Sequence, residues 1–408
     1  MNAASTRPDS ARWLNRRRLR AHGLLLAVGL WAVYAVNMST AGLRDRGGLI
    51  KGTDFLHFYT LGKLALAGRG DLLYDMQAQS TLLGQWVAAA AGSVYVPLYG
   101  PQVAMFFELF ARLSYGWALT AWLLLNGLIY AGCCFAVYRT CPNLRSEMGT
   151  VAVLAIAFPG LFHLIAWGQT SGLALGFLTL AYLALRRRRS LLAGAAIGCL
   201  IFKPQLGLAA AVVFVLGAEW KVVVGAVLSA ALQLALAWMR FGSAVMQNYA
   251  RALWHVREVM RLLEPRPYQM HSLRAFWSLL LPWPQVAFGL YLLSAAAVLG
   301  LLVSCWWREP ALELRFSALL FATVLVSPHL TVYDLVILAP AFLLLGDYAA
   351  GAVDSGKLGS LLYACYPLFL LGPLARYTHV QLSVAAMAAV LAVIVWRRFP
   401  TPPYSKNP

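Results

Sequence analysis

Residues 167–208 read WGQTSGLALGFLTLAYLALRRRRSLLAGAAIGCLIFKPQLGL, in which two long apolar runs are divided by four consecutive arginines. The runs do not alternate between polar and apolar residues, as the strands of a membrane barrel would. Apolar runs separated by short basic turns are typical of membrane-spanning helices, because a helix satisfies its backbone hydrogen bonds within one segment. We therefore expect an all-α polytopic membrane protein.

Composition supports the same fold class over the whole chain. Of its 408 residues, 61% are hydrophobic and 12% are charged, whereas soluble domains carry about 25% charged residues. The mean hydropathy is +0.68. So few charged groups could not cover a surface in water, and the lengths of the apolar runs predict about 10–12 transmembrane helices.

The charges are mostly basic, with 33 Lys and Arg against 15 Asp and Glu. They lie mostly in short runs between apolar segments, which indicates membrane topology and makes a nucleic-acid partner a weak interpretation. The six cysteines lie in or beside apolar segments and form no CxxC pair, so we interpret them as packing residues without disulfides or metal.

The basic connectors predict the topology. Apolar segments lie near 22–43, 116–138, 148–166, 169–185, 190–217, 220–239, 286–306, 313–327, 332–346, 358–374 and 378–396. Placing both termini in the cytoplasm leaves two long external loops, 42–100 and 240–285. Residues 1–398 then form one membrane domain and residues 399–408 a short cytoplasmic tail. Segment 190–217 must cross twice, and Lys203 and Pro204 interrupt it.

The first external loop contains GTDFLHFYTLGKLALAGRGDLLYD, residues 52–75. Asp54 is either a general base at the membrane surface or the cap of an amphipathic helix that ends at Gly68. We expect Asp75 to cap a second helix. His57 shares a helix face with Asp54, or else is an exposed interfacial histidine.

Cations at membrane depth and in the second external loop indicate phosphate binding. Lys203 faces a cavity and reaches a phosphate, or else it snorkels to the interface. Arg266, His271 and Arg274 lie in EPRPYQMHSLRAFW, residues 264–277. Arginine forks bind phosphate, although anchoring to lipid headgroups fits them equally.

Polar residues of two further segments fall on the same side of the membrane as Asp54. They are Gln169 in AWGQTSG and His329, Tyr333 and Asp334 in SPHLTVYDLVIL. Each alone is more often a cap or an interhelical hydrogen bond, but together they predict a site on the external face. P-loop, HExxH and GxSxG motifs are missing, so a nucleotide-driven pump or a membrane protease has no support.

Three blocks of the sequence, residues 52–75, 167–208 and 327–338, resemble glycosyltransferase family 87. Its members are polyprenol-phosphate-mannose-dependent mannosyltransferases of the GT-C superfamily. One departure is YGP at 99–101, where the family usually has Tyr-Pro-Pro. The resemblance implies a GT-C fold with an extracytoplasmic active site, and it places Asp54 at the catalytic acidic position of the first loop. Lys203, Gln169 and His329 also match motif positions.

The expected reaction is transfer of a sugar, with mannose implied by the family, from a polyprenyl-phosphate donor to an acceptor hydroxyl at the outer face of the cytoplasmic membrane. The acceptor is a glycolipid or a glycan, and the anomeric centre inverts. Asp54, which should ionise readily near cations, is the base, and neither a metal nor a cofactor is required. The phosphate-binding candidates are Lys203, Arg266 and Arg274; the substrate-binding candidates are His57, Tyr59, Gln169, His271, His329 and Asp334.

Two other classes of protein remain open. Broken helices and buried charge also fit a secondary transporter or a lipid flippase. A transporter site lies at the membrane midplane between two related halves, and no such relation is seen in the sequence. A structural subunit without activity is the third possibility.

Overall fold

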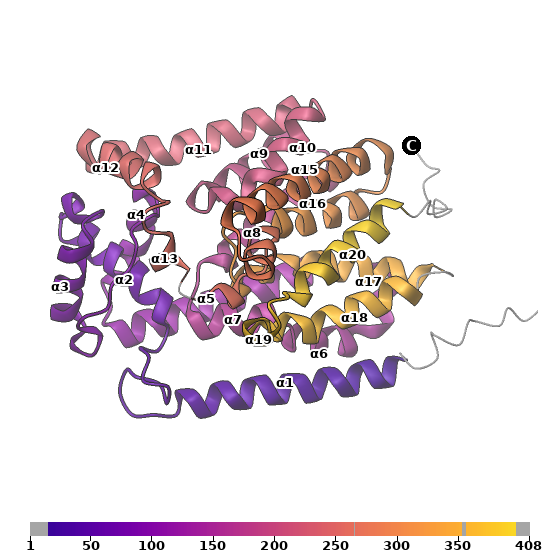
Figure 1. Cartoon of the computed structure of the whole chain (residues 1–408), viewed down its shortest axis with the longest axis horizontal. Helices are drawn as coiled ribbons and strands as arrows, with labels where there is room; N and C mark the ends of the chain where they lie inside the picture. The colour runs from indigo at the N-terminus through magenta and orange to yellow at the C-terminus, as the bar shows by residue number, and fades with distance from the viewer. Residues whose placement is uncertain (1–14, 265, 353–355, 397–408) are drawn as a thin grey trace, which may run out of the picture.

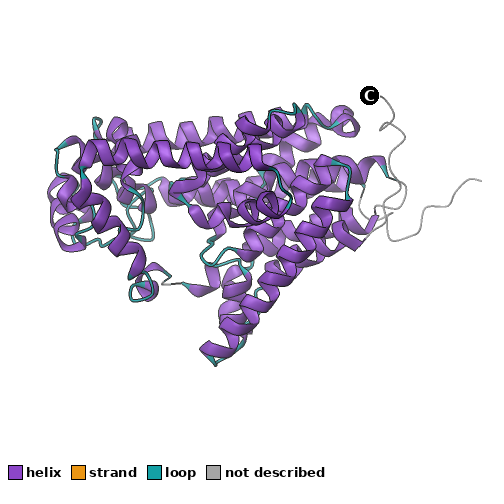
Figure 2. Cartoon of the chain, turned by 90° about the horizontal axis from the view of Figure 1, so that it is seen from above, coloured by secondary structure: helices purple, strands orange, loops and turns teal. Residues whose placement is uncertain are grey.

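The regular structure of the chain is helical, as expected. The computed structural model describes residues 15–264, 266–352 and 356–396; residues 1–14 and the expected tail at 399–408 lie outside this description. Within the described ranges, β pairing is confined to two isolated bridges, Arg44 with Ile50 and Met270 with Thr331. Figure 2 shows helices and loops throughout the described chain. The predicted fold class, an all-α polytopic membrane protein, is confirmed.

Five helices of the described residues are long and apolar enough to cross a membrane. They are α1 (Arg16–Met38), α5 (Tyr115–Tyr138), α11 (Trp220–Phe241), α15 (Pro284–Arg308) and the continuous pair of η8 (Val332–Leu338) and α17 (Ala339–Gly351). Two bent pairs would raise this number to seven. One joins η4 (Pro142–Glu147) and α6 (Met148–Ile156) to α7 (Pro159–Trp167); the other joins α18 (Gly356–Leu370) to η9 (Gly372–Leu374) and α19 (Ala375–Thr378).

Shorter apolar helices fill the space between these spans. They are α4 (Pro101–Ala111), α8 (Ser171–Arg186), α16 (Leu312–Val326) and α20 (Leu382–Trp396). Segment 190–217 is divided into α9 (Ser190–Gly198), η5 (Cys199–Phe202), η6 (Pro204–Gly207) and α10 (Leu208–Leu216). Lys203 stands between η5 and η6, so the predicted interruption of this segment is confirmed.

Small residues allow α9 and α11 to pack at very short distance. A Cβ atom added to Gly194 would lie 2.0 Å from the carbonyl oxygen of Val222, and one added to Gly198 would lie 2.2 Å from that of Ala226. From the other side, a Cβ atom on Gly225 would lie 2.2 Å from the carbonyl oxygen of Leu191. Close backbone contact of this kind is a common way to join helices in lipid, where apolar burial alone does not favour association.

The two long loops gather at one end of the molecule, on the left in Figure 1. The first contains α2 (Thr53–Leu66), η2 (Gly70–Leu72), α3 (Met76–Trp86) and η3 (Ala88–Ala90). The second contains α12 (Ser243–Trp254), α13 (Met260–Leu263), η7 (Pro267–Gln269) and α14 (Leu273–Leu280). Asp75 caps α3, because its carboxylate accepts hydrogen bonds from the backbone N–H groups of Gln77 and Ala78 at 3.0 and 2.9 Å. The predicted second helix and its cap are confirmed.

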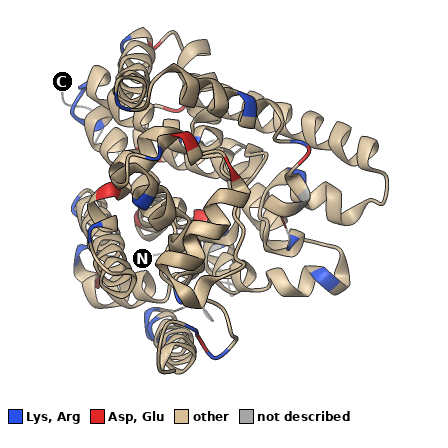
Figure 3. Ribbon diagram, turned by 90° about the vertical axis from the view of Figure 1, so that its left-hand side faces the viewer, with Lys and Arg blue, Asp and Glu red and all other residues tan. Residues whose placement is uncertain are grey.

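The opposite end of the bundle is braced by ion pairs between helix ends. Arg186 at the end of α8 lies 3.0 Å from Glu313 at the start of α16, and Arg16 lies 2.6 Å from Glu147. The turn of four arginines is at this end. Figure 3 views the other end of the molecule, where charged residues interrupt a mostly uncharged ribbon. The basic turns and the long loops are thus at opposite ends of the spans.

Candidate functional site

Asp54 lies in the first turn of α2. This helix begins directly after Gly52, whose backbone is in the left-handed conformation. Gly52 has φ of +67°, and a Cβ atom there would lie 2.3 Å from the side chain of Leu119; only glycine combines this backbone with this space. Asp54 does not cap the helix: its Oδ2 atom accepts a hydrogen bond of 2.8 Å from the Nε2 atom of Gln169. The capping alternative for Asp54 is therefore wrong.

The neighbouring residues Gly168 and Thr170 orient the side chain of Gln169 toward Asp54. It follows Gly168, which ends α7 with φ of +67° and whose added Cβ would lie 2.8 Å from the Cβ of Phe55. The Oε1 atom of Gln169 accepts a hydrogen bond of 3.0 Å from the backbone N–H of Thr170. With its oxygen engaged there, the amide nitrogen faces the carboxylate. Gln169 thus holds one oxygen of Asp54 and leaves Oδ1 without a hydrogen bond to any described residue.

A buried ion pair connects three other segments. The Nζ atom of Lys203 lies 2.8 Å from the Oδ1 atom of Asp334 and 3.0 Å from the Oγ atom of Ser171. Ser171 in turn donates a hydrogen bond of 2.6 Å to Asp334. Lys203 is 4% and Asp334 1% exposed, so the snorkelling alternative for Lys203 is wrong. Asp334 also bonds the backbone N–H of Thr331, which completes a capping box at the start of η8.

The charges of Lys203 and Asp334 also act on the pKa of Asp54. Burial raises the pKa of Asp54 to about 6, while the hydrogen bond from Gln169 and the charge of Lys203 lower it. The nearby cations alone predicted that Asp54 would ionise readily. Burial removes water from its carboxylate, however, and this raises the pKa by more than the cations lower it. A carboxylate with a pKa near 6 is still mostly ionised at pH 7 and is a stronger base than an exposed aspartate.

Aromatic rings surround the next turn of α2. His57 is 5% exposed and stacks on Tyr95 at 5.2 Å and near Tyr99 at 5.9 Å between ring centroids. Burial lowers the pKa of His57 to about 4, so the ring is neutral at pH 7. Neither ring nitrogen has a hydrogen-bond partner among the described residues. The exposed alternative for His57 is wrong, and its neutral ring carries one donor and one acceptor that no described residue satisfies.

Tyr59 and His271 lie in packed surroundings. The hydroxyl of Tyr59 donates to the carbonyl of Leu113 at 2.9 Å. His271 is fully buried, with its Nδ1 atom 2.7 Å from the Oγ atom of Ser383 in α20. Burial lowers the pKa of His271 to about 3, which keeps the ring neutral. Both side chains hold helices together in this structure.

Glu264 joins two of the predicted site residues and was not identified from the sequence. It pairs with Arg274 and accepts a hydrogen bond at 2.9 Å from His329. Burial alone would raise the pKa of Glu264, but the bond from His329 and the charge of Arg274 lower it below its ordinary range. Arg274 also donates to the carbonyl of Pro328. It is one of two carboxylates in this loop, with Glu258, so no local signal singled it out.

Arg266 is the exposed cation of the group. Its guanidinium lies 5.9 Å from the ring of Trp167, within the range of a cation–π contact. Arg266 has no acidic partner among the described residues, unlike Lys203 and Arg274. Trp167 directly precedes Gly168 and Gln169, so Arg266 lies beside the segment that holds Asp54.

The described side chains form no cluster of three His, Cys, Asp or Glu residues that would hold a metal ion. The site combines a carboxylate of raised pKa, neutral imidazole rings with unpartnered nitrogens, and basic groups on neighbouring segments. Ser171, Glu264, Tyr95 and Tyr99 belong to it as well, although nothing in their local sequence marks them.

Fold and site together define a polytopic all-α membrane protein with a polar, acid-and-base site at one end of its helices. The sequence model of glycosyltransferase family 87 matches residues 98–328, more than half of the chain, and the protein belongs to this family. It is a membrane glycosyltransferase. The match includes Gln169, Lys203 and Arg274, whereas Asp54 and Asp334 lie outside it. No curated protein and no solved structure matches the chain.

Proposed function

We propose that the protein transfers a sugar, with mannose as the family expectation, from a polyprenyl-phosphate donor to an acceptor hydroxyl, with inversion. The observation that carries this proposal is the Asp54 carboxylate, held at one oxygen by Gln169 and raised in pKa to about 6. Such a group is a base near neutral pH. It lies at one end of the spans, where a lipid-linked phosphate would meet it at the membrane surface.

In the proposed step, the free Oδ1 atom of Asp54 takes the proton of the acceptor hydroxyl. The hydroxyl oxygen forms a bond to the anomeric carbon, while the bond from that carbon to the phosphate oxygen breaks. The electron pair leaves with polyprenyl phosphate, and the proton on Asp54 passes to solvent afterwards. We assign contact with the sugar to His57 and its neighbouring rings, because apolar faces with unpartnered polar groups suit a carbohydrate.

The departing phosphate needs positive charge. Arg266 is available without breaking an ion pair. Lys203 has three N–H donors, of which Ser171 and Asp334 use two. Arg274 is held by Glu264. We assign the first contact to Arg266 and a supporting electrostatic role to Lys203 and Arg274.

The charge distribution favours an extracytoplasmic site in the cytoplasmic membrane. The turn at residues 186–189 and the basic start of α1 are at the end opposite to Asp54. Basic connectors are retained in the cytoplasm, so we place this end inside and the long loops outside. The donor and a glycolipid or glycan acceptor then meet at the outer interface, with no nucleotide sugar or metal in the scheme.

The test uses purified protein in nanodiscs with radiolabelled polyprenyl-phosphate-mannose and a membrane-lipid extract as acceptor. Asp54→Asn should reduce label transfer by about 10²- to 10⁴-fold, the contribution of a general base. Asp75→Asn is the matched control: Asn also caps helices, so transfer should persist. Equal turnover in wild type and Asp54→Asn would contradict the assignment. Failure of wild type with every polyprenyl-phosphate sugar, despite donor binding, would favour a transporter or flippase.

A further inference from the structure

Two of the described side chains each have a pair of polar atoms that is buried without a hydrogen-bond partner. They are His57, with both ring nitrogens, and Gln102, with its amide oxygen and nitrogen. The other unpartnered buried atoms of the described residues occur one to a side chain. Buried polar groups in proteins are nearly always paired, so an unpaired set next to a functional site points to a ligand as the partner.

Both side chains adjoin Tyr99. The ring centroids of His57 and Tyr99 lie 5.9 Å apart, and Gln102 follows Tyr99 by three residues, in the first turn of α4. Burial raises the pKa of Tyr99, and the charges of Lys203 and Asp54 are among those that also act on it. Tyr99 is therefore within reach of the proposed base and of a proposed phosphate-site cation, and the unpaired amide lies on the segment that continues from it.

Gly100 provides the space in which the amide of Gln102 lies. The backbone of Gly100, with φ of −63° and ψ of 153°, is one that any residue adopts, so this turn does not require glycine. A Cβ atom added to Gly100 would lie 2.3 Å from the Oε1 atom of Gln102 and 2.7 Å from its Nε2 atom. The three atoms nearest to this added Cβ all belong to Gln102. The absence of a side chain at residue 100 thus accommodates the amide.

Gly100 is also the residue at which the chain departs from its family, because YGP at 99–101 stands where Tyr-Pro-Pro is usual. A proline has a Cβ atom and would meet the amide of Gln102 as an alanine would. Gly100 and Gln102 therefore form a matched pair, and the position of the amide is a feature of this chain rather than of the family as a whole.

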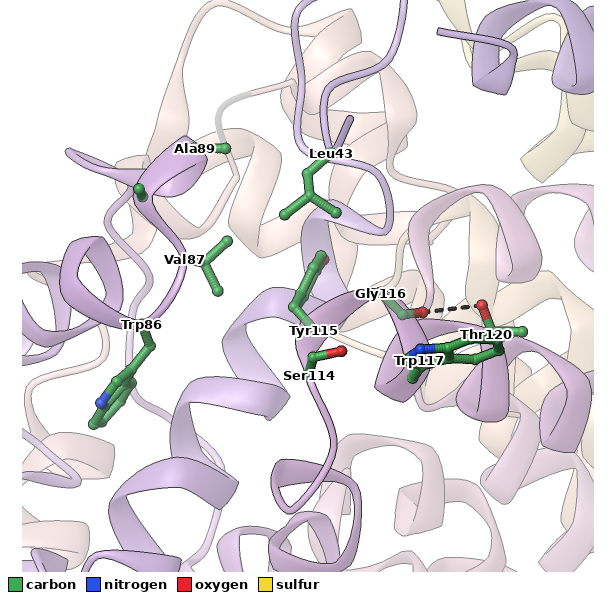
Figure 4. A pocket seen from close by; sticks show the side chains of 10 residues that line it. Leu43, Trp86, Val87, Ala89, Ser114, Tyr115, Gly116, Trp117 and Thr120 are labelled. Carbon is green, nitrogen blue, oxygen red and sulfur yellow. Dashed lines mark hydrogen bonds between the residues drawn. The ribbon is translucent and has the colours of Figure 1, made fainter. Parts of the chain in front are cut away.

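The unpaired amide is separate from the open cavity of about 710 Å³ at the start of α5. Figure 4 shows Leu43, Val87 and Tyr115 around that space. Neither His57 nor Gln102 lines it. Contact with this cavity therefore does not supply the hydrogen bonds that the two side chains lack.

We propose that Gln102 is a specificity-determining residue, whose amide binds two neighbouring hydroxyls of the sugar carried by the donor. This inference rests on the proposed function. A hydroxyl both donates and accepts hydrogen bonds, so neighbouring hydroxyls match the oxygen and the N–H groups of one amide. In the proposed step, the sugar lies between the acceptor oxygen, which Asp54 activates, and the phosphate, which Lys203 supports. Since both charges act on Tyr99, we assign the donor sugar to the groups beside Tyr99.

The experiment compares donors that differ in the orientation of one or two hydroxyls. Purified protein in nanodiscs receives polyprenyl-phosphate-linked mannose, glucose or galactose with a membrane-lipid extract as acceptor, and binding of each donor is measured beside its transfer. Wild type should prefer one sugar. Gln102→Met retains the length of the side chain without its polar atoms. It should lower kcat/KM for the preferred sugar about tenfold, the effect of one or two neutral hydrogen bonds, with a smaller effect on the other sugars and no change in acceptor KM.

Gly100→Ala should reproduce this loss of preference, because its methyl group would take the place of the amide. The double variant should be no worse than either single variant. Gln77→Met is the matched control for the first substitution, since Gln77 is an exposed glutamine of the first loop. Gly127→Ala is the control for the second, since an added Cβ there meets nothing within 4 Å. Neither control should alter the sugar preference.

Stability separates a binding role of Gln102 from a packing role. Gln102→Met removes two unpaired buried polar atoms, so the midpoint of thermal unfolding should not fall. A lower midpoint with an unchanged sugar preference would overturn the proposal, as would a wild-type preference that Gly100→Ala leaves intact. A rise in acceptor KM instead of a lost sugar preference would overturn the assignment to the donor.

The binding measurement keeps this inference distinguishable from the proposed function. Wild-type protein that binds the donors and transfers no sugar would contradict the proposed function. The donor-binding preferences of wild type and Gln102→Met would then still decide the role of Gln102, because equal preferences would overturn it. Failure of wild type to bind any of the donors would contradict both proposals.

Discussion

Asp54 shows how a single carboxylate is tuned by groups that are distant in the sequence. Burial raises its pKa to about 6, and Gln169, which is 115 positions away, lowers it through a hydrogen bond. The same bond fixes one oxygen and leaves the other for a substrate proton. The position of the Asp54 carboxylate and part of its pKa shift therefore depend on one amide, whose own orientation is set by the backbone of Thr170.

Removal of the Gln169 amide should move the pH profile of transfer. The base works when ionised, so the rate falls as pH drops through the pKa of about 6. Gln169→Ala removes a bond that lowers this pKa, and the acid limb of kcat/KM should shift to higher pH. Radiolabel transfer measured from pH 5 to 9 in both proteins checks this. A lower rate with an unmoved limb would mean that Gln169 has only a packing role.

At the scale of elements, the position of the Lys203 break depends on the contact between α9 and α11. Gly194, Gly198 and Gly225 bring the two backbones together. Since α9 leads directly through η5 to Lys203, this contact sets where the ammonium group lies. Packing between these two helices is thus connected to the electrostatics of the site.

Gly194→Val should separate α9 from α11, because its side chain would meet the carbonyl of Val222. Overpacking of this kind costs about 1–3 kcal/mol. We expect a lower midpoint of thermal unfolding in detergent, followed by tryptophan fluorescence, together with reduced transfer. Gly289→Val on α15 is the control, since an added Cβ there meets nothing within 4 Å. Equal midpoints for the two variants would contradict the close contact.

At the scale of the whole molecule, the buried pair of Lys203 and Asp334 joins segments from the middle and the end of the chain. Ser171 at the start of α8, the break after η5 and the first turn of η8 meet at these side chains. Loss of one partner leaves a buried charge, whereas loss of both leaves none. The pair therefore makes the arrangement of three distant segments interdependent.

Lys203→Met should destabilise the protein by about 3–5 kcal/mol, because Asp334 is left as an unpaired buried charge. Addition of Asp334→Asn should restore much of the lost stability, measured as the unfolding midpoint in detergent. Transfer should not recover in the double variant, since the positive charge near Asp54 is still missing. Full recovery of activity would mean that Lys203 acts through stability alone.

The sequence by itself determined the class of protein, because apolar length and basic turns are local properties that decide whether a segment enters lipid. It also predicted α2, α3 with its Asp75 cap, and the interruption at Lys203, each of which depends on residues within a few positions. It singled out Asp54 and Gln169 separately, but not their hydrogen bond.

Only the tertiary structure decided which groups meet. Lys203 and Asp334 are 131 positions apart, and Glu264 is 65 positions from His329. Such contacts depend on the packing of helices between them, which no local pattern records. The same holds for the burial that raises the pKa of Asp54 and for the cavity beside α5, since both arise from segments that fold against one another.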